Sequence, residues 1–270
     1  MSRRADIVIG GGLLAAMIVL ALLAPYLLTG DPRALSPGNR LLAPSAGHWF
    51  GTDQLGRDLL TRVLYGARIS LFVGFSVALL SSLVGTLVGM VSASDRRLDA
   101  IVMRVMDGVM SIPAILLAIA LMAVIGGSVL NVIVAVTIVE IPRVARLIRG
   151  IVLSLREQPY VEAAVAAGTS RPMIVWRHLL PGVMAPLIVQ ATFVWATAMI
   201  LEAGLSFIGA GTPPSTPSWG NILADARALW QIRPTLIFFP GVFLFVTLLA
   251  VNMLGDGLRD LLDPRQAPET

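Results

Sequence analysis

The chain has 270 residues, of which 56% are hydrophobic and 13% charged, and its mean hydropathy is +0.84. Soluble domains carry about 25% charged residues, so this composition excludes a water-soluble globular protein and predicts that lipid surrounds much of the chain. Cysteine is absent, which excludes disulfides and thiol chemistry, and two histidines do not support a histidine-rich metal site. All twenty basic residues are arginine, without a basic face interleaved with aromatics, so nucleic acid is not a predicted partner.

Uncharged stretches predict the membrane-spanning helices. Five stand out, at residues 7–30, 69–94, 108–139, 182–201 and 234–255, and about 20 residues of helix cross the hydrocarbon core. The third has 32 residues and would be about 48 Å long as a helix. Because Gly126-Gly127-Ser128 forms a natural turn inside it, we divide it into helices at 108–125 and 129–147. An all-α integral membrane protein with six transmembrane helices is therefore expected.

Residues 1–68 are interpreted as an N-terminal anchor helix followed by an extracytoplasmic amphipathic segment. The first apolar stretch is longer than the core of a cleaved signal peptide and lacks a small-residue cleavage site, so it is expected to stay as an anchor. Thr52 or Asp53 is expected to cap a separate helix lying on the membrane. Its apolar face would comprise Leu55, Leu59, Leu60, Val63 and Leu64.

Residues 69–258 are expected to form the transmembrane core. Ser81, Gly85 and Gly89 repeat every four residues, which suits close helix packing within the bundle or a contact between two chains. Residues 95–107 place apolar side chains on one face and arginines elsewhere, which predicts an interfacial helix.

Arginine placement indicates the orientation. With the N-terminus inside, thirteen arginines face the cytoplasm and seven face outside, which favours cytoplasmic N- and C-termini. Residues 259–270 would then be a cytoplasmic tail.

The cytoplasmic loop at 148–181 holds the most informative pattern. Pro159 suits the first turn of a helix, and the alanine-rich residues after it favour helix. Gly168 suits the left-handed end of that helix, and Ser170 can cap a second short helix that ends at Leu180, before Pro181. The predicted shape is a rigid bend exposed to the cytosol, suited to a groove on a partner protein.

This pattern resembles a known family. Glu162-Ala163-Ala164, Gly168 and Leu180-Pro181 resemble the coupling loop of permease subunits in binding-protein-dependent ABC importers. His178 stands where the usual pattern has isoleucine, and the form Arg177-His178-Leu179-Leu180-Pro181 is similar to the peptide/nickel branch. Further segments similar to the second, C-type permease of dipeptide and oligopeptide importers are at residues 50–58, 202–209, 217–220 and 254–260.

The resemblance implies a type I ABC importer permease fold in the bacterial inner membrane and a specific set of partners. These would be a second, related permease in a heterodimer, two ATP-binding cassette subunits that hold ATP and Mg, and an extracytoplasmic substrate-binding protein. Glu162 to Ala164, Gly168, Leu180 and Pro181 would form the contact with the ATPase. The chain itself would bind no cofactor and catalyse no reaction, consistent with its lack of a phosphate-binding loop. Dipeptides, longer peptides, glutathione-like compounds and nickel complexes all remain open as substrates.

Two other functions are considered. An ion-coupled secondary transporter could use Glu140 or Glu202 as a titrating group, although internal repeats are expected for that class and none is found. These two acids could equally be structural anchors, Glu140 through Arg143. An intramembrane protease would need a metal site, a Ser/His pair at membrane depth or paired aspartates, and the sequence offers no His-Glu-x-x-His motif.

Overall fold

The computed structural model describes residues 3–28 and 30–262 and is entirely helical apart from loops and two isolated β-bridges. The predicted all-α fold is confirmed. The helices are α1 (Arg3–Leu27), α2 (Leu59–Ser92), α3 (Arg96–Met110), α4 (Ala114–Ile125), α5 (Val129–Arg156), α6 (Pro159–Ala166), α7 (Arg171–Ile174), α8 (Leu180–Phe207), α9 (Trp219–Ala226) and α10 (Thr235–Leu262), with a 3₁₀ turn at Pro37–Asn39 and a π-helical turn at Val175–Leu179.

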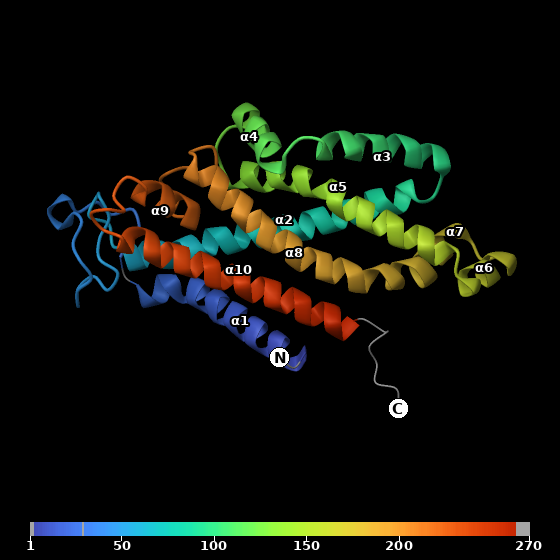
Figure 1. The fold of residues 1–270 in the computed structure, drawn as a ribbon, viewed down its shortest axis with the longest axis horizontal. Helices are drawn as coiled ribbons and strands as arrows, with labels where there is room; N and C mark the ends of the chain where they lie inside the picture. The colour runs from blue at the N-terminus through green and yellow to red at the C-terminus, as the bar shows by residue number, and fades with distance from the viewer. Residues whose placement is uncertain (1–2, 29, 263–270) are drawn as a thin grey trace.

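The long helix α2 lies at the centre of an elongated bundle, between α5, α8 and the α1–α10 pair (Figure 1). Its glycines allow a close approach to α5. A Cβ on Gly85 would lie 2.6 Å from Val144 Cβ, and one on Gly89 would lie 2.6 Å from the Ala145 carbonyl oxygen. Of the two roles expected for the small-residue repeat, helix packing within the bundle or a contact between two chains, the structure shows the first.

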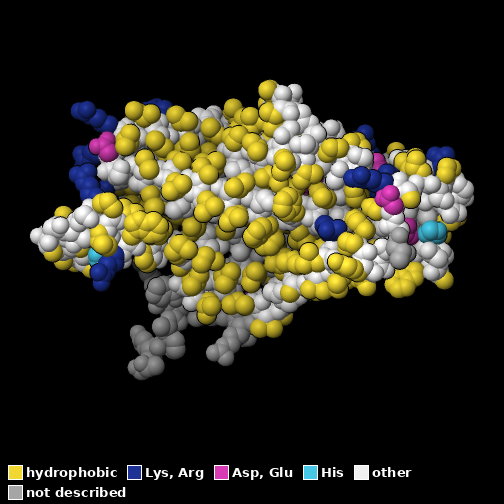
Figure 2. All heavy atoms as spheres, turned by 180° about the vertical axis from the view of Figure 1, so that it is seen from behind, with side chains coloured by type: hydrophobic (Ala, Val, Ile, Leu, Met, Phe, Trp, Pro, Cys, Tyr) yellow, Lys and Arg dark blue, Asp and Glu magenta, His cyan; other side chains and the backbone are white. Residues whose placement is uncertain are grey.

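The bundle has two polar ends with an apolar middle. α6 and α7 project from one end, toward which α1 begins and α10 finishes, whereas residues 30–58 and α9 gather at the opposite end (Figure 1). Figure 2 shows that hydrophobic side chains dominate the visible face between these ends and that most charged side chains lie near them. This distribution is that of a protein spanning a membrane along its long axis.

The number of spans differs from the prediction. Four helices in the described residues are long and apolar enough to cross a membrane, and α3 with α4 could add a fifth, broken by a 90° bend. The predicted helix at 108–125 is wrong because Pro113, which disfavours helix at the residue before it, separates α3 from α4. The 12 residues of α4 extend only about 18 Å. The six-helix count is thus not confirmed.

Two other local predictions are confirmed. Gly126 ends α4 with a φ of 83°, and α5 begins at Val129, so the turn lies where the glycine pair placed it. The helix predicted at 95–107 corresponds to α3, which Asp95 caps. Because α3 runs beside α5 along the long axis of the bundle (Figure 1), its expected position in the membrane interface is not confirmed. Arg149 ties α3 to α5 by donating a hydrogen bond from Nε to Asp99 Oδ1 at 2.5 Å.

The separate amphipathic helix predicted after Thr52 is wrong. Residues 53–57 form a turn in which Gly56 has a φ of 76°, and a Cβ there would lie 1.8 Å from the Ser36 carbonyl oxygen. Asp58, not Thr52 or Asp53, caps the next helix by accepting from Thr61 N at 2.8 Å. That helix is α2, which runs unbroken from residue 59 into the membrane, across the boundary expected at 68/69.

Residues 259–262 of the expected tail belong to α10, and the rest of the tail lies outside the described residues.

Candidate functional site

The most prominent projection is the elbow, defined here as residues 159–179. Its first helix, α6, begins at Pro159, where the missing backbone N–H costs nothing. Gly168 follows α6 with a φ of 77°, and nothing lies within 4 Å of the position a Cβ would occupy. Backbone conformation alone therefore favours glycine at this bend. Ser170 then precedes α7 as its N-cap residue, but its side chain makes no capping hydrogen bond.

The elbow is attached to the bundle by apolar side chains. Val161, Ile174 and Leu179 are buried and belong to the same core cluster as α2, α5 and α8. At its return into the bundle, a Cβ on Gly182 would lie 2.7 Å from Leu155 Cδ1, so α8 starts in close contact with the end of α5. A force applied to the elbow would therefore reach the long helices through packed side chains.

The outer face of the elbow is unusually apolar for a polar end of the molecule. Tyr160, Val165, Met173 and Trp176 are 49%, 59%, 51% and 70% exposed. Glu162 on α6 is also exposed and makes no side-chain hydrogen bond or ion pair with any residue in 3–28 or 30–262. Exposed apolar side chains gathered in this way mark a surface for another protein.

The predicted site residues fall into two groups. Glu162, Ala163 and Ala164 lie on α6, with Gly168 just beyond it, whereas Leu180 and Pro181 lie in the first turn of α8. The helix break predicted at Leu180-Pro181 is wrong. The π-helical turn at Val175–Leu179 changes the hydrogen-bond spacing ahead of the proline, so the helix passes from α7 into α8 without a loop. The cytoplasmic loop was expected to begin at residue 148, but it begins later, since α5 extends to Arg156.

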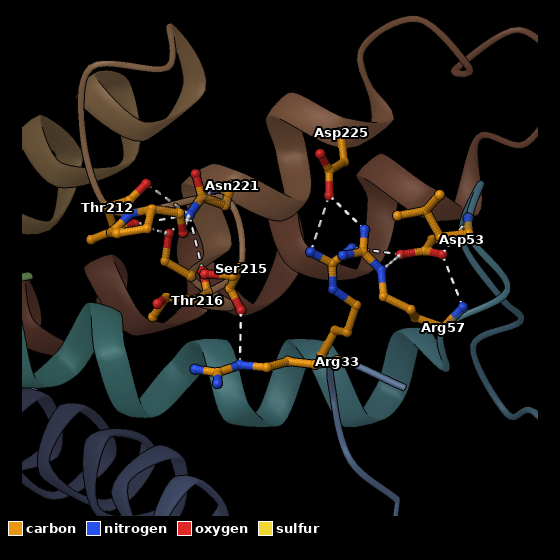
Figure 3. A network of polar contacts seen from close by, with 12 residues as sticks. Arg33, Asp53, Arg57, Thr212, Ser215, Thr216, Asn221 and Asp225 are labelled. Carbon is orange, nitrogen blue, oxygen red and sulfur yellow. Dashed lines mark hydrogen bonds and ion pairs between the residues drawn. The ribbon is translucent and has the colours of Figure 1, made fainter. Parts of the chain in front are cut away.

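A second polar cluster, absent from the sequence-based site, lies at the opposite end (Figure 3). The carboxylate of Asp53 accepts hydrogen bonds from Arg57 Nε and Arg62 NH1, both at 2.6 Å. Asp225 on α9 accepts from the same two arginines at 2.9 and 3.0 Å. The side chain of Arg57 is only 10% exposed and that of Arg62 only 1%. This network fixes the 30–58 segment, α2 and α9 to one another.

Its separation in sequence explains why it was missed. Asp225 lies 163 positions after Arg62 and 168 after Arg57, so no local spacing reveals the pairing. The only available signal was the clustering of charge at residues 53–62, within the stretch interpreted as a surface helix.

The two membrane acids have different surroundings. Glu202, fully buried, accepts from Ser70 Oγ at 3.1 Å and Ser206 Oγ at 2.9 Å, joining α8 to α2. Glu140 is 1% exposed, and Arg143 NH1 lies 3.2 Å from its Oε2 atom, outside hydrogen-bonding geometry. The expected Glu140–Arg143 pair is therefore present, and the hydroxyl shell of Glu202 is that of a helix-joining anchor.

Comparison with known proteins identifies the family. Residues 85–268 match the family model for the binding-protein-dependent transport system inner membrane component. A probable peptide ABC transporter permease protein of Sinorhizobium fredii is 53% identical over 97% of this chain and 90% of that protein. A dipeptide transport system permease protein of Alkalihalophilus pseudofirmus is 42% identical over 96% of this chain and 85% of that protein.

A solved structure supports the fold independently. The MetNI methionine ABC transporter in an inward-facing conformation has a chain that superposes with a TM-score of 0.63 at 21% identity, covering 73% of this chain and 94% of that one. At this identity the likeness shows the fold alone, the type I importer permease fold predicted above. The chain belongs to the family of binding-protein-dependent transport system inner membrane components, and it is a multi-pass membrane permease subunit of an ABC transporter.

Proposed function

We propose that this chain is one half of a heterodimeric permease that imports peptides, and that its elbow receives the motion of an ATP-binding cassette subunit. The observation that carries the coupling role is the elbow itself. It combines an exposed apolar face, an unpaired carboxylate at Glu162 within the described residues, and a buried attachment to α2, α5 and α8. A plain connector between two spans requires none of these features.

Coupling would follow from rigidity. Closure of the two ATPase subunits on ATP and Mg would displace α6, and the buried Val161 and Ile174 would pass that displacement to the long helices. Glu162 would supply the fixed polar contact, Ala163 and Ala164 the close approach, and Gly168 the bend. Leu180 and Pro181 would carry the movement into α8. The two permease halves would then alternate between inward- and outward-open arrangements.

The proposed orientation places the elbow, the N-terminus and the C-terminus in the cytoplasm. The excess of arginine among the segments assigned to that side supports it. The opposite end, with the Asp53–Asp225 network, would then face an extracytoplasmic substrate-binding protein. The chain contributes no catalytic residue, since ATP hydrolysis takes place in the partner subunits.

Peptides are proposed as the substrate because the similar proteins are named as peptide and dipeptide permeases. An ion-coupled mechanism has less support, because Glu202 is held by hydroxyl groups of the bundle.

The coupling role can be tested by reversing the charge of the elbow. Glu162→Lys is expected to abolish peptide uptake while membrane insertion and the amount of protein stay normal. Glu157→Lys is the matched control: it makes the same charge change at an exposed position five residues earlier, before α6 begins. Uptake should survive in the control. Normal uptake by Glu162→Lys would reject the coupling role.

A further inference from the structure

A groove of 1110 Å³ opens between α1 and α2 near the end that carries α9. Its walls are apolar and come from three helices: Ile18 and Leu22 of α1, Phe72 and Phe75 of α2, and Trp195 of α8. All three helices belong to segments long and apolar enough to cross a membrane. The groove therefore lies at the depth of lipid rather than of water.

Charged and amphipathic side chains stand at its mouth. Arg68 is exposed, has its guanidinium 5.8 Å from the centre of the Tyr65 ring, and makes no hydrogen bond or ion pair within residues 3–28 and 30–262. Arg33 donates from Nε to the Ser215 carbonyl oxygen at 3.1 Å (Figure 3). The one acid in the lining, Asp31, accepts from the Arg33 backbone N–H at 2.8 Å. Two cations against one anion leave the mouth positive.

The groove has the depth of one leaflet. Below Arg68, α2 continues with Phe72 and Phe75, which are 52% and 50% exposed. Arg68 and Phe75 are about 10 Å apart along the helix axis, and one leaflet contributes about 15 Å of hydrocarbon. The α1 lining reaches inward only to Ile18. A cationic mouth above an apolar groove of this length fits one lipid better than a helix that crosses the whole membrane.

Trp195 completes the apolar lining of the groove. A Cβ on Gly74 would lie 2.5 Å from Trp195 Cδ1, so the indole packs directly on the backbone of α2. Its ring contacts Phe75 edge-on with 5.4 Å between centroids. The indole nitrogen is itself buried against the backbone of α2, so the groove meets the apolar ring of Trp195 and not its polar atom.

We propose that this groove binds one anionic glycerophospholipid from the leaflet opposite the elbow. The phosphate lies at Arg68 and Arg33, and an acyl chain follows Phe72 and Phe75 down to the ring of Trp195. The proposal depends only on the chain spanning a membrane and not on its substrate or coupling role. The uptake test of Glu162→Lys can therefore fail without affecting it, and the reverse is also true.

Native mass spectrometry of the complex purified with its partner subunits tests the headgroup contact. Phosphatidylglycerol should bind more tightly than phosphatidylcholine, and Arg68→Gln should weaken phosphatidylglycerol about five-fold, the effect of one arginine near an anionic lipid surface. The matched control is Arg227→Gln, an exposed arginine at the same end, whose side-chain hydrogen bond is to the Phe207 carbonyl oxygen at 3.5 Å. It should leave binding unchanged. Equal binding of the two lipids, or no effect of Arg68→Gln, would overturn the proposal. If Arg68→Gln does not fold, Arg33→Gln takes its place under the same criteria.

Two further measurements identify the occupant. Phosphatidylglycerol with brominated acyl chains should quench fluorescence in the wild type, and Trp195→Phe should lose part of that quenching. The chain has no cysteine, so Phe72→Cys introduces its only thiol. Efficient crosslinking of that thiol to the second permease would mean that a protein helix fills the groove, and it would overturn the lipid assignment, as would unchanged quenching in Trp195→Phe.

Discussion

The network of Asp53, Arg57, Arg62 and Asp225 makes a graded prediction about stability. Asp53 is 4% exposed and accepts from both arginine side chains and from the backbone N–H groups of Leu55 and Arg57. Asp53→Asn keeps the shape but removes the charge opposite two buried guanidinium groups, and breaking a buried pair in this way costs about 3–5 kcal/mol. The side chain of Asp225 is 28% exposed and accepts only two hydrogen bonds, so Asp225→Asn should cost about 1.5 kcal/mol.

Unfolding of the purified protein in detergent, followed by heat or by denaturant, measures this order directly. Asp53→Asn should lower stability most, Asp225→Asn less, and Glu157→Gln, at an exposed position, by no more than about 0.5 kcal/mol. The reasoning is refuted if Asp225→Asn is as damaging as Asp53→Asn, or if Asp53→Asn behaves like Glu157→Gln. Either result would mean that the buried arginines do not depend on Asp53.

Two further predictions concern glycines. Gly85→Val should destabilise the α2–α5 contact by about 1–3 kcal/mol or more, because even a Cβ would lie 2.6 Å from Val144 Cβ. Gly108→Val on α3, where nothing lies within 4 Å of the Cβ position, should lose less stability. Equal melting temperatures for the two variants would contradict the tight contact. Gly168→Ala should lower stability by about 1 kcal/mol, because alanine disfavours the left-handed backbone at this position, and it should reduce uptake. Gly168→Asn, whose side chain tolerates that conformation, should retain more uptake. Equal uptake by the two variants would contradict a role for this bend.

Local signals in the sequence predicted several parts of the fold. Gly126 and Gly168 both have positive φ at helix ends, because the chain there adopts a conformation that few residues other than glycine accept. Pro159 begins α6 as expected. In each case the determining interaction lies within four residues along the chain, which is the range that a pattern can report.

The errors arose where distant contacts decide the structure. The apolar spacing of residues 55–64 fits a surface helix, but the backbone of Ser36 against Gly56 and the ion pairs to Asp225 fix residues 53–57 as a turn. The helix continues through Pro181, a residue that normally ends a helix, because the π-helical turn before it changes the hydrogen-bond spacing. The groove at Arg68 could not be predicted either, since α1, α2 and α8 form it together.

The central claim is that the elbow lies on the cytoplasmic side and touches an ATPase subunit, and cysteine chemistry tests it most directly. Ala163→Cys would introduce the chain's only thiol at an exposed position on α6. A membrane-impermeant maleimide should label it in inside-out vesicles prepared without the ATPase subunits but not in intact cells, and a short crosslinker should join it to the ATP-binding subunit in the assembled complex. Ser45→Cys, at the opposite end, should show the reverse labelling. Labelling of Ala163→Cys from outside intact cells, or no crosslink to the ATPase in the assembled complex, would contradict the account.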